Sequence, residues 1–303
     1  MTREEPYAER HAFLIMAHKS ASQINRLIRV LDSAKADIYL HIDKKAGLDQ
    51  NSIVDPQISS LKFCPSIDVH WADYSQTKCE VEMLRFATGV GHYAYYHLLS
   101  ESDFPLLSVG EMAHRLEGSD KLYLHFARPD NVVATRQFVN CYHPFQKKLA
   151  MVNRDSTFSI YKVFEKLSIA GQRLFRVNRI PSDFVLKKGA NWFSIPDDFA
   201  RFVVTKGAWI ESQFHSTRSS DEFFMQTIAY NNPSYRERIY SLKEDDSYEA
   251  CLRHIDWNRG NPYTFVSADY DELLGSGMLF ARKFDESVDE EILVKLESHL
   301  KNK

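Results

Sequence analysis

The sequence predicts an α/β protein with a mostly parallel central sheet flanked by helices. An almost wholly apolar run of strand length, residues 11–17, is followed by an amphipathic helical pattern and then by a second apolar run, residues 37–42. Strands that are apolar on both faces are typical of parallel sheets covered by helices on each side. The chain has 303 residues and is 44% hydrophobic, so it can bury such a core.

Helix and strand signals continue along the chain. The first helix is expected to begin after Ser20, a residue type that caps helix N-termini. Its buried face then repeats at Ile24, Leu27, Ile28 and Leu31. Further helices are predicted at 80–90, 112–116, 160–176, 221–230 and 290–300, a strand or helix end at 92–99, and further strands at 121–126 and 191–195. No linker rich in proline, glycine or serine divides the chain, so we expect a single domain over residues 1–303.

Composition excludes several classes of function. The 38 Lys and Arg residues nearly balance the 41 Asp and Glu residues, and no run of five like charges occurs, which argues against a nucleic-acid partner. The four cysteines form no C-x-x-C pair, so a zinc site or a disulfide framework is not expected. The first ten residues are too polar for a signal peptide, and no apolar stretch approaches the roughly 18 residues of a membrane span. We therefore expect a soluble protein without an integral membrane segment.

The common catalytic and nucleotide-binding motifs are absent. The sequence contains no G-x-x-x-x-G-K-[ST] loop, no G-x-S-x-G elbow and no H-E-x-x-H helix. Polar clusters instead follow apolar strands and helices, at the positions where open α/β sheets bind ligands. The most specific clusters are AHK at 17–19, HIDKK at 41–45, LS-x-x-DFPL at 99–106, SSDEFF-x-QT at 219–227 and LFARKFD at 279–285.

This ordered series resembles the core-2/I-branching family of β-1,6-N-acetylglucosaminyltransferases and their peptide O-xylosyltransferase relatives, in the form of a soluble, bacterial-type member. The resemblance runs from about residue 11 to residue 285. It implies a GT-A-like fold and an inverting, β-forming transfer that needs no metal ion and no other cofactor. Two positions depart from the family pattern: Ala72 follows Trp71, and Glu101 stands in the LS-x-x-DFP segment, where the family often has glycine at each.

The resemblance also implies substrates and a location. The donor would be a UDP-sugar, with UDP-GlcNAc first and UDP-xylose as the alternative within the family. The acceptor would be a hydroxyl of a glycan or of a lipid-linked oligosaccharide, in the biosynthesis of a surface polysaccharide. The enzyme would be cytoplasmic, or peripheral at the inner face of the membrane. The oligomeric state stays open.

Glu222 matches the catalytic base of the family. A carboxylate at that position can take the proton of the acceptor hydroxyl while the nucleotide leaves from the opposite face of the sugar. The same residue has a purely structural interpretation, because Ser219-x-x-Glu222 also fits a capping box ahead of the helix that follows.

The other site residues follow from the same comparison. Lys283 matches the family's cation for the leaving diphosphate, with Arg282 beside it and Arg259 as the nearest partnering arginine. His18 and Asp43 follow the first two strands, where they could meet uracil and ribose. Asp103 and Trp192 are expected to contact a sugar. The alternative for each is an ordinary turn, core or surface residue. The one D-x-D segment, 269–271, is interpreted as a solvated acidic face, so no metal ligand is assigned.

Two rival functions belong to other classes. A glycoside hydrolase would need a second carboxylate roughly 5–10 Å from Glu222, and Asp103 or Asp256 are the candidates. A non-catalytic glycan-binding protein would keep aromatic platforms and tolerate the loss of Glu222. Four histidines in apolar segments are interpreted as core residues; they are His41, His97, His125 and His254.

Overall fold

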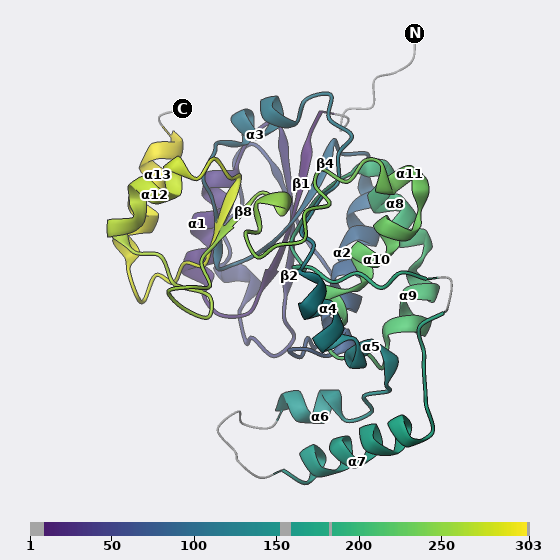
Figure 1. Ribbon diagram of the computed structural model, residues 1–303. Coiled ribbons are helices and arrows are strands. Elements are labelled where there is room, and N and C mark those ends of the chain that lie inside the picture. Colours follow the sequence, from purple (N-terminus) through teal and green to yellow (C-terminus); the bar gives the residue numbers. More distant parts are fainter. Residues whose placement is uncertain (1–8, 152–158, 182–183, 302–303) are drawn as a thin grey trace.

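The computed structural model describes residues 9–151, 159–181 and 184–301. Its centre is a sheet with the strand order β3-β2-β1-β4-β7-β6 (Figure 1). The strands are β1 (His11–Ala17), β2 (Ala36–Ile42), β3 (Ser60–Phe63), β4 (Tyr95–Ser100), β6 (Tyr123–Leu124) and β7 (Phe193–Pro196). Strands β1 to β4 pair in parallel, while β7 runs antiparallel to both β4 and β6. The predicted α/β class with a mostly parallel sheet is confirmed.

Strand β1 shows why the sequence is apolar on both faces. Ala12 and Leu14 point into one buried cluster, and Phe13 and Ile15 point into another on the opposite face. The first cluster is completed by α2 (Tyr74–Val90), α8 (Asp197–Thr205), α9 (Gly207–Phe214) and α10 (Phe224–Asn231). The second is completed by α1 (Ala21–Leu31), α3 (Val109–Leu116), α12 (Tyr270–Gly275) and α13 (Glu290–Lys301). Helices therefore cover both faces, as the pattern predicted.

Most predicted elements are present with shifted ends. Ser20 caps α1 by accepting a hydrogen bond from the Gln23 N–H at 3.2 Å, as expected. Helix α2 begins six residues before the predicted 80–90, because Asp73 supplies the cap. The predicted helix 221–230 is divided into a 3₁₀ turn, η2 (Ser220–Glu222), and α10.

A second sheet brings two of the sequence motifs together. Strand β9 (Phe280–Arg282) pairs antiparallel with β5 (Asp103–Pro105) and parallel with β8 (Arg253–Ile255). Phe104 lies opposite Ala281, so the DFP and FAR segments are direct neighbours although about 180 residues separate them. Residues of both sheets share the buried cluster that contains Phe13. The single-domain division stays a prediction.

Two helices extend away from this body. Figure 1 shows α6 (Gln146–Met151) and α7 (Ile160–Leu174) as an arm, reached through α4 (Pro129–Thr135) and α5 (Gln137–Asn140). The remaining short helices are η1 (Gln50–Ser52), α11 (Pro233–Arg236), η3 (Glu249–Cys251) and η4 (Ser267–Asp269). Within the described ranges, no helix combines the length and the apolar character needed to cross a bilayer.

Candidate active site

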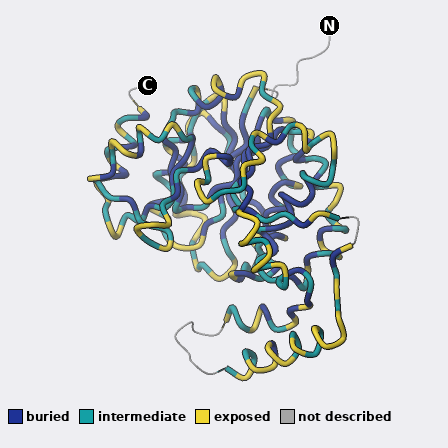
Figure 2. Tube along the Cα trace, in the orientation of Figure 1, coloured by how far each residue is buried: buried dark blue, intermediate teal, exposed yellow. Residues whose placement is uncertain are grey.

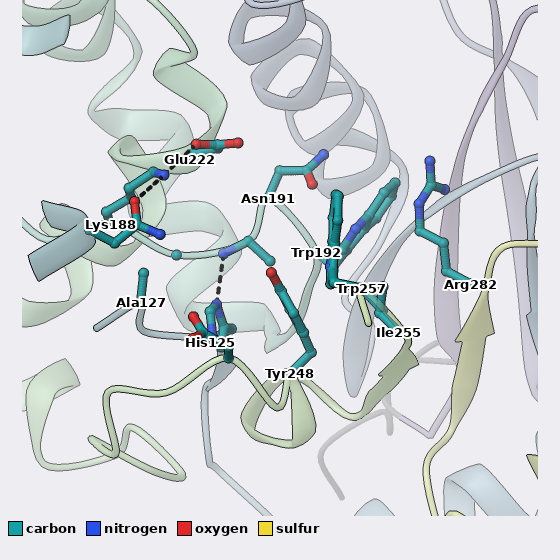
Figure 3. Close-up of a pocket in the computed structure, with 14 residues that line it drawn as sticks. His125, Ala127, Lys188, Asn191, Trp192, Glu222, Tyr248, Ile255, Trp257 and Arg282 are labelled. Atoms are coloured by element: carbon teal, nitrogen blue, oxygen red, sulfur yellow. Dashed lines mark hydrogen bonds and ion pairs between the residues drawn. The ribbon is translucent and has the colours of Figure 1, made fainter. Parts of the chain in front are cut away.

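A small pocket with a cavity volume of about 100 Å³ brings together three of the predicted site residues. Glu222, Trp192 and Arg282 all line it, although they come from η2, the segment before β7, and β9 (Figure 3). The distant motifs therefore meet at one place, which their order along the chain could not establish.

Glu222 presents its carboxylate to this pocket from a fixed backbone. Its carbonyl accepts a hydrogen bond from the Gly189 N–H at 2.8 Å, and Lys188 Nζ lies 3.1 Å from Glu222 Oε2. The side chain is 38% exposed, so a ligand can reach it. The capping-box interpretation is wrong: Ser219 adopts a left-handed φ of 51° and makes no side-chain cap, and α10 begins only at Phe224.

Gly189 and His125 hold the segment that carries Lys188. A Cβ on Gly189 would lie 1.8 Å from the carbonyl oxygen of His125, so only glycine fits there. The Ala190 N–H donates to His125 Nδ1 at 3.0 Å, and His125 Nε2 donates to the Asp245 carbonyl at 2.6 Å. Burial lowers the pKa of His125, which favours this neutral form. His125 is buried, as predicted, yet it also lines the pocket.

Two buried carboxyl groups lie behind Glu222. Gln76 Nε2 donates to Asp221 Oδ2 at 2.9 Å. Burial first, and then the charge of Glu222, raise the pKa of Asp221 to about 7. The pKa of Glu80 is raised well above its ordinary value, chiefly by complete burial and also by Asp221, and hydrogen bonding to Asn191 and Gln76 offsets part of the rise. An acidic pair that resists ionisation therefore lies behind Glu222.

Aromatic rings form one wall of the pocket. Trp192, Tyr248 and Trp257 line it, and Figure 3 shows their side chains close to one another. Tyr248 stacks on His125 with 4.4 Å between ring centroids, and its ring lies 6.3 Å from that of Trp257. Trp257 is 49% exposed. Flat, partly exposed rings of this kind provide surfaces on which a sugar can stack.

Arg282 closes the other end of the pocket. Its guanidinium lies 4.4 Å from the Trp192 ring, and its Nη1 donates to Asp103 Oδ1 at 3.2 Å and to Ser100 Oγ. Asp103 is completely buried, and it also accepts a hydrogen bond from the Ser100 N–H. In this geometry Asp103 orients Arg282 and is not available for the predicted sugar contact.

His18 and Asp43 lie at the carboxyl edge of the main sheet, as predicted from their positions after β1 and β2. The register places Ala17 opposite Ile42 and Met16 opposite Ser100, so the ends of β1, β2 and β4 meet there. His18 is exposed. Asp43 accepts hydrogen bonds from the backbone N–H and the ammonium group of Lys45, at 2.8 and 3.2 Å. This edge is where doubly wound sheets bind nucleotides.

Lys283 and Arg259 have different surroundings. Lys283 is half-buried and does not line the pocket. The pKa of Asp285 is lowered first by a hydrogen bond from Ser287 and then by the charges of Lys19 and Lys283, so both lysines act on this carboxylate. Arg259 binds the carboxylates of Asp256, Asp269 and Glu272. The diphosphate role predicted for Arg259 has no support in this arrangement, because three carboxylates already neutralise the guanidinium.

Comparison with known proteins identifies the family of this chain. The model of the Core-2/I-Branching enzyme family matches residues 11–273. The chain belongs to the core-2/I-branching enzyme family. The resemblance predicted from the five sequence motifs is therefore confirmed.

Several members of the core-2/I-branching family are similar over nearly the whole chain. Xylosyltransferase 2 of Canis lupus familiaris is 23% identical over 311 residues, which cover 96% of this chain and 34% of that protein. The beta-1,3-galactosyl-O-glycosyl-glycoprotein beta-1,6-N-acetylglucosaminyltransferase 4 of Danio rerio is 23% identical over 320 residues, covering 96% of this chain and 70% of that protein. The chain thus spans about a third of the length of the xylosyltransferase.

Among solved structures, the apo structure of the bifunctional glycosyltransferase WbbM matches with a TM-score of 0.28 and 12% identity, over 83% of this chain and 50% of that one. A score of this size carries no argument about the site.

The two departures from the core-2/I-branching pattern have structural explanations. Ala72 has a φ of 60°, a left-handed conformation in which glycine is favoured, and its carbonyl accepts a hydrogen bond from the Ser219 N–H at 2.9 Å. Glu101 is almost completely buried, and its Oε2 accepts hydrogen bonds from the backbone N–H groups of His18 and Lys19 at 2.8 and 2.9 Å. Glu101 therefore fixes the loop after β1 at the carboxyl edge of the main sheet.

Sequence reasoning missed several residues of the pocket. Lys188, Asn191, Tyr248 and Trp257 line it. Asn191 and Trp257 belong to two polar clusters of the series that resembles the family, residues 191–194 and 253–257, but neither residue was assigned a role. The available signal was the segment KKGANW at 187–192, in which lysines and a glycine directly precede a buried strand.

Proposed function

We propose that this chain is an inverting, metal-independent glycosyltransferase that moves a sugar from a UDP-sugar to a hydroxyl of a glycan, with a β linkage in the product. The observation that carries the proposal is the position of Glu222, whose partly exposed carboxylate faces a pocket walled by aromatic rings and closed by Arg282. The names of the relatives, a xylosyltransferase and an N-acetylglucosaminyltransferase, support sugar transfer as the reaction class.

The chemistry follows from this arrangement. Glu222 accepts the proton of the acceptor hydroxyl as its oxygen attacks the anomeric carbon of the donor. The bond from that carbon to the diphosphate breaks on the opposite face, and UDP leaves with additional negative charge. We assign the neutralisation of that charge to Lys283, with Arg282 second, because Arg282 lines the pocket and donates to Ser100 at the end of β4, and Lys283 directly follows it in the chain.

UDP-GlcNAc is the donor that we propose first, and UDP-xylose is the competing donor. We propose a cytoplasmic enzyme whose acceptor is a glycan or a lipid-linked oligosaccharide of a surface polysaccharide.

The glycoside hydrolase alternative is weaker in this geometry. Neither Asp103 nor Asp256 lines the pocket: Asp103 is completely buried, and Asp256 is bound by Arg259. The second carboxylate at the pocket is Asp246, which is 57% exposed and lies 3.6 Å from Arg128.

A donor screen tests the proposed function. Melting temperatures measured with UDP, UDP-GlcNAc, UDP-xylose, UDP-Gal and UDP-Glc, each with and without EDTA, should show stabilisation by UDP and by one UDP-sugar, unchanged by EDTA. The product of that donor, analysed by NMR, should carry a β-linked sugar. Turnover of a glycan without any nucleotide would support the hydrolase instead, and glycan binding with no turnover would support a binding protein.

A further inference from the structure

Helix α7 carries its apolar stripe on the outside of the molecule. Ile160, Val163, Phe164, Leu167 and Leu174 follow the spacing i, i+3, i+4, i+7 and i+14, which places them on one face of the helix. Leu167 is 63% exposed and Leu174 is 78% exposed, and the other three are also exposed. Figure 2 shows this helix as one of the most exposed segments. In a soluble domain such a stripe normally faces the core.

The opposite, polar face attaches α7 to the body. Glu165 is buried and lies 2.6 Å from His143 Nδ1. Gln172 accepts a hydrogen bond from the Tyr142 N–H at 2.7 Å and donates one to the Tyr142 carbonyl at 2.9 Å. The usual orientation of an amphipathic helix is therefore reversed, and these contacts turn the apolar stripe outward. Only Phe164 of the stripe has a described ring contact, with Phe145 at 6.0 Å between centroids.

The arm is also strongly basic. In its described residues, 146–151 and 159–181, seven lysines and arginines stand against one acid, Glu165, whereas the whole chain has a net charge of −3. The basic residues are Lys147, Lys148, Lys162, Lys166, Arg173, Arg176 and Arg179. Lys166 lies on the flank of α7 nearest the apolar stripe, next to Val163 on the helix surface, Arg173 lies farther round, and Lys162 lies on the side opposite the stripe. An exposed apolar stripe with a basic flank is the pattern of helices that lie in a membrane interface.

The geometry points to an anionic lipid bilayer as the occupant of this face. We infer that α7 lies parallel to the membrane, with Phe164 and Leu167 among the acyl chains and Lys166 at the lipid phosphates. Lys147 is paired with Asp68, and Arg179 is half-buried and bound by backbone carbonyls. A symmetric contact with a second copy of the chain would bring the remaining basic residues of the arm against the same residues, whereas anionic headgroups neutralise them. The inference does not rest on the proposed transfer reaction, since membrane binding is measured without donor or acceptor.

Co-sedimentation of the full chain with vesicles tests this inference. The protein should bind vesicles of phosphatidylcholine with 30% phosphatidylglycerol, and binding should weaken at high salt and on pure phosphatidylcholine. Phe164→Ser with Leu167→Ser should lower the partition coefficient more than tenfold. Lys148→Gln with Lys166→Gln should lower it about 10- to 30-fold, because each basic residue near an anionic surface contributes about fivefold.

Matched control variants test whether vesicle binding depends on α7 or on any exposed apolar or basic side chain. Ile58→Ser with Val288→Ser removes two apolar side chains that are 63% and 58% exposed elsewhere, and Lys78→Gln with Lys301→Gln removes two exposed charges. Both controls should bind vesicles like the parent, and melting temperatures should show that all variants are folded. Absence of binding, equal binding to neutral vesicles, or parental binding by the α7 variants would overturn the inference. A dimer in light scattering that Phe164→Ser with Leu167→Ser abolishes, without vesicle binding, would assign this face to a second copy instead.

Discussion

The ammonium group of Lys188 lies 3.1 Å from Oε2 of Glu222, and only 12% of the Lys188 side chain is exposed. Gly189, the next residue in the chain, packs so closely against the carbonyl of His125 that no Cβ would fit there. This contact fixes the backbone that carries Lys188. The carboxylate that we assign as the base is therefore oriented by a cation as well as by its own backbone. This arrangement makes separate predictions for the two residues.

Glu222→Gln should lower kcat by about 10²–10⁴, because the amide cannot accept the proton of the acceptor hydroxyl. The melting temperature and the affinity for UDP should stay close to those of the parent. Glu222→Ala should also melt close to the parent, since Glu222 is not part of a capping box. Asp246→Asn, at a more exposed carboxylate of the same pocket, is the matched control and should keep near-parental turnover. Near-parental turnover of Glu222→Gln would remove Glu222 from the mechanism.

Lys188→Met should lower kcat/KM by roughly 10- to 100-fold, because the Glu222 carboxylate loses the partner that orients it. The effect on stability should be small, about 1 kcal/mol or less, since Glu222 is partly exposed and solvent screens the pair. Steady-state kinetics and thermal melting measure the two effects. Lys188→Arg should recover part of the rate. Parental kcat/KM in Lys188→Met would show that backbone contacts alone position Glu222.

Lys283→Ala should weaken UDP binding by roughly 1.5–3 kcal/mol, the scale of a lost charge-assisted hydrogen bond. Calorimetric titration with UDP should give the same affinity with and without EDTA for the parent protein. Arg259→Ala should instead lower the melting temperature and leave UDP affinity unchanged, since its guanidinium is bound by Asp256, Asp269 and Glu272. A Mn²⁺-reversible loss of binding in EDTA would contradict the metal-independent mechanism.

The parallel part of the sheet could be predicted from the sequence because two apolar runs, residues 11–17 and 37–42, are each buried on both faces. The family motifs were also sufficient to predict that Glu222 and Arg282 belong to one site. The sequence could not distinguish the position of Arg282 from that of Lys283, since both were expected to bind the leaving diphosphate. In the structure Arg282 lines the pocket and Lys283 does not, and this difference depends on the local path of the backbone after β9, which the motif does not specify.

The basic and aromatic residues of the pocket were not predictable in the same way. Lys188, Tyr248 and Trp257 lie in irregular segments, whose paths depend on tertiary contacts such as the close approach of Gly189 to His125. Periodicity carries no information about such segments. The capping-box interpretation failed for a related reason, because the left-handed Ser219 is held by a distant partner, the carbonyl of Ala72.

Ala72→Gly should raise the free energy of unfolding by about 0.5–1 kcal/mol. A left-handed conformation costs a non-glycine residue roughly 1–2 kcal/mol, and the greater entropy of glycine in the unfolded chain offsets part of the gain. Denaturant unfolding of the two proteins measures the difference. Ala113→Gly, in the interior of α3, is the control and should destabilise by about 0.5–1 kcal/mol. A loss of stability in Ala72→Gly would show that packing of the buried methyl group outweighs the backbone strain.

Asp221→Asn should change how stability depends on pH. The pKa of Asp221 is raised from 3.8 to about 7 in the folded protein, so folding favours its protonated form. The stability that this group contributes is fully present below pH about 4 and is lost as the pH rises toward 7. Asparagine stays neutral and can still accept the hydrogen bond from Gln76. Asp221→Asn should therefore become more stable relative to the parent between pH 4 and pH 7, by a few kcal/mol at most, and the difference should level off above that range.

Thermal melting of parent and variant at half-unit steps from pH 4 to pH 8 measures this difference, and Glu80→Gln provides a second test. Complete burial first, and then the charge of Asp221, raise the pKa of Glu80 well above its ordinary value, so folding favours its protonated form as well. The curve of Glu80→Gln should therefore also diverge upward from the parent curve as the pH rises. Parallel curves for Asp221→Asn would mean that Asp221 ionises in the folded state as readily as in the unfolded state. The acidic pair behind Glu222 would then be charged at neutral pH, contrary to its burial.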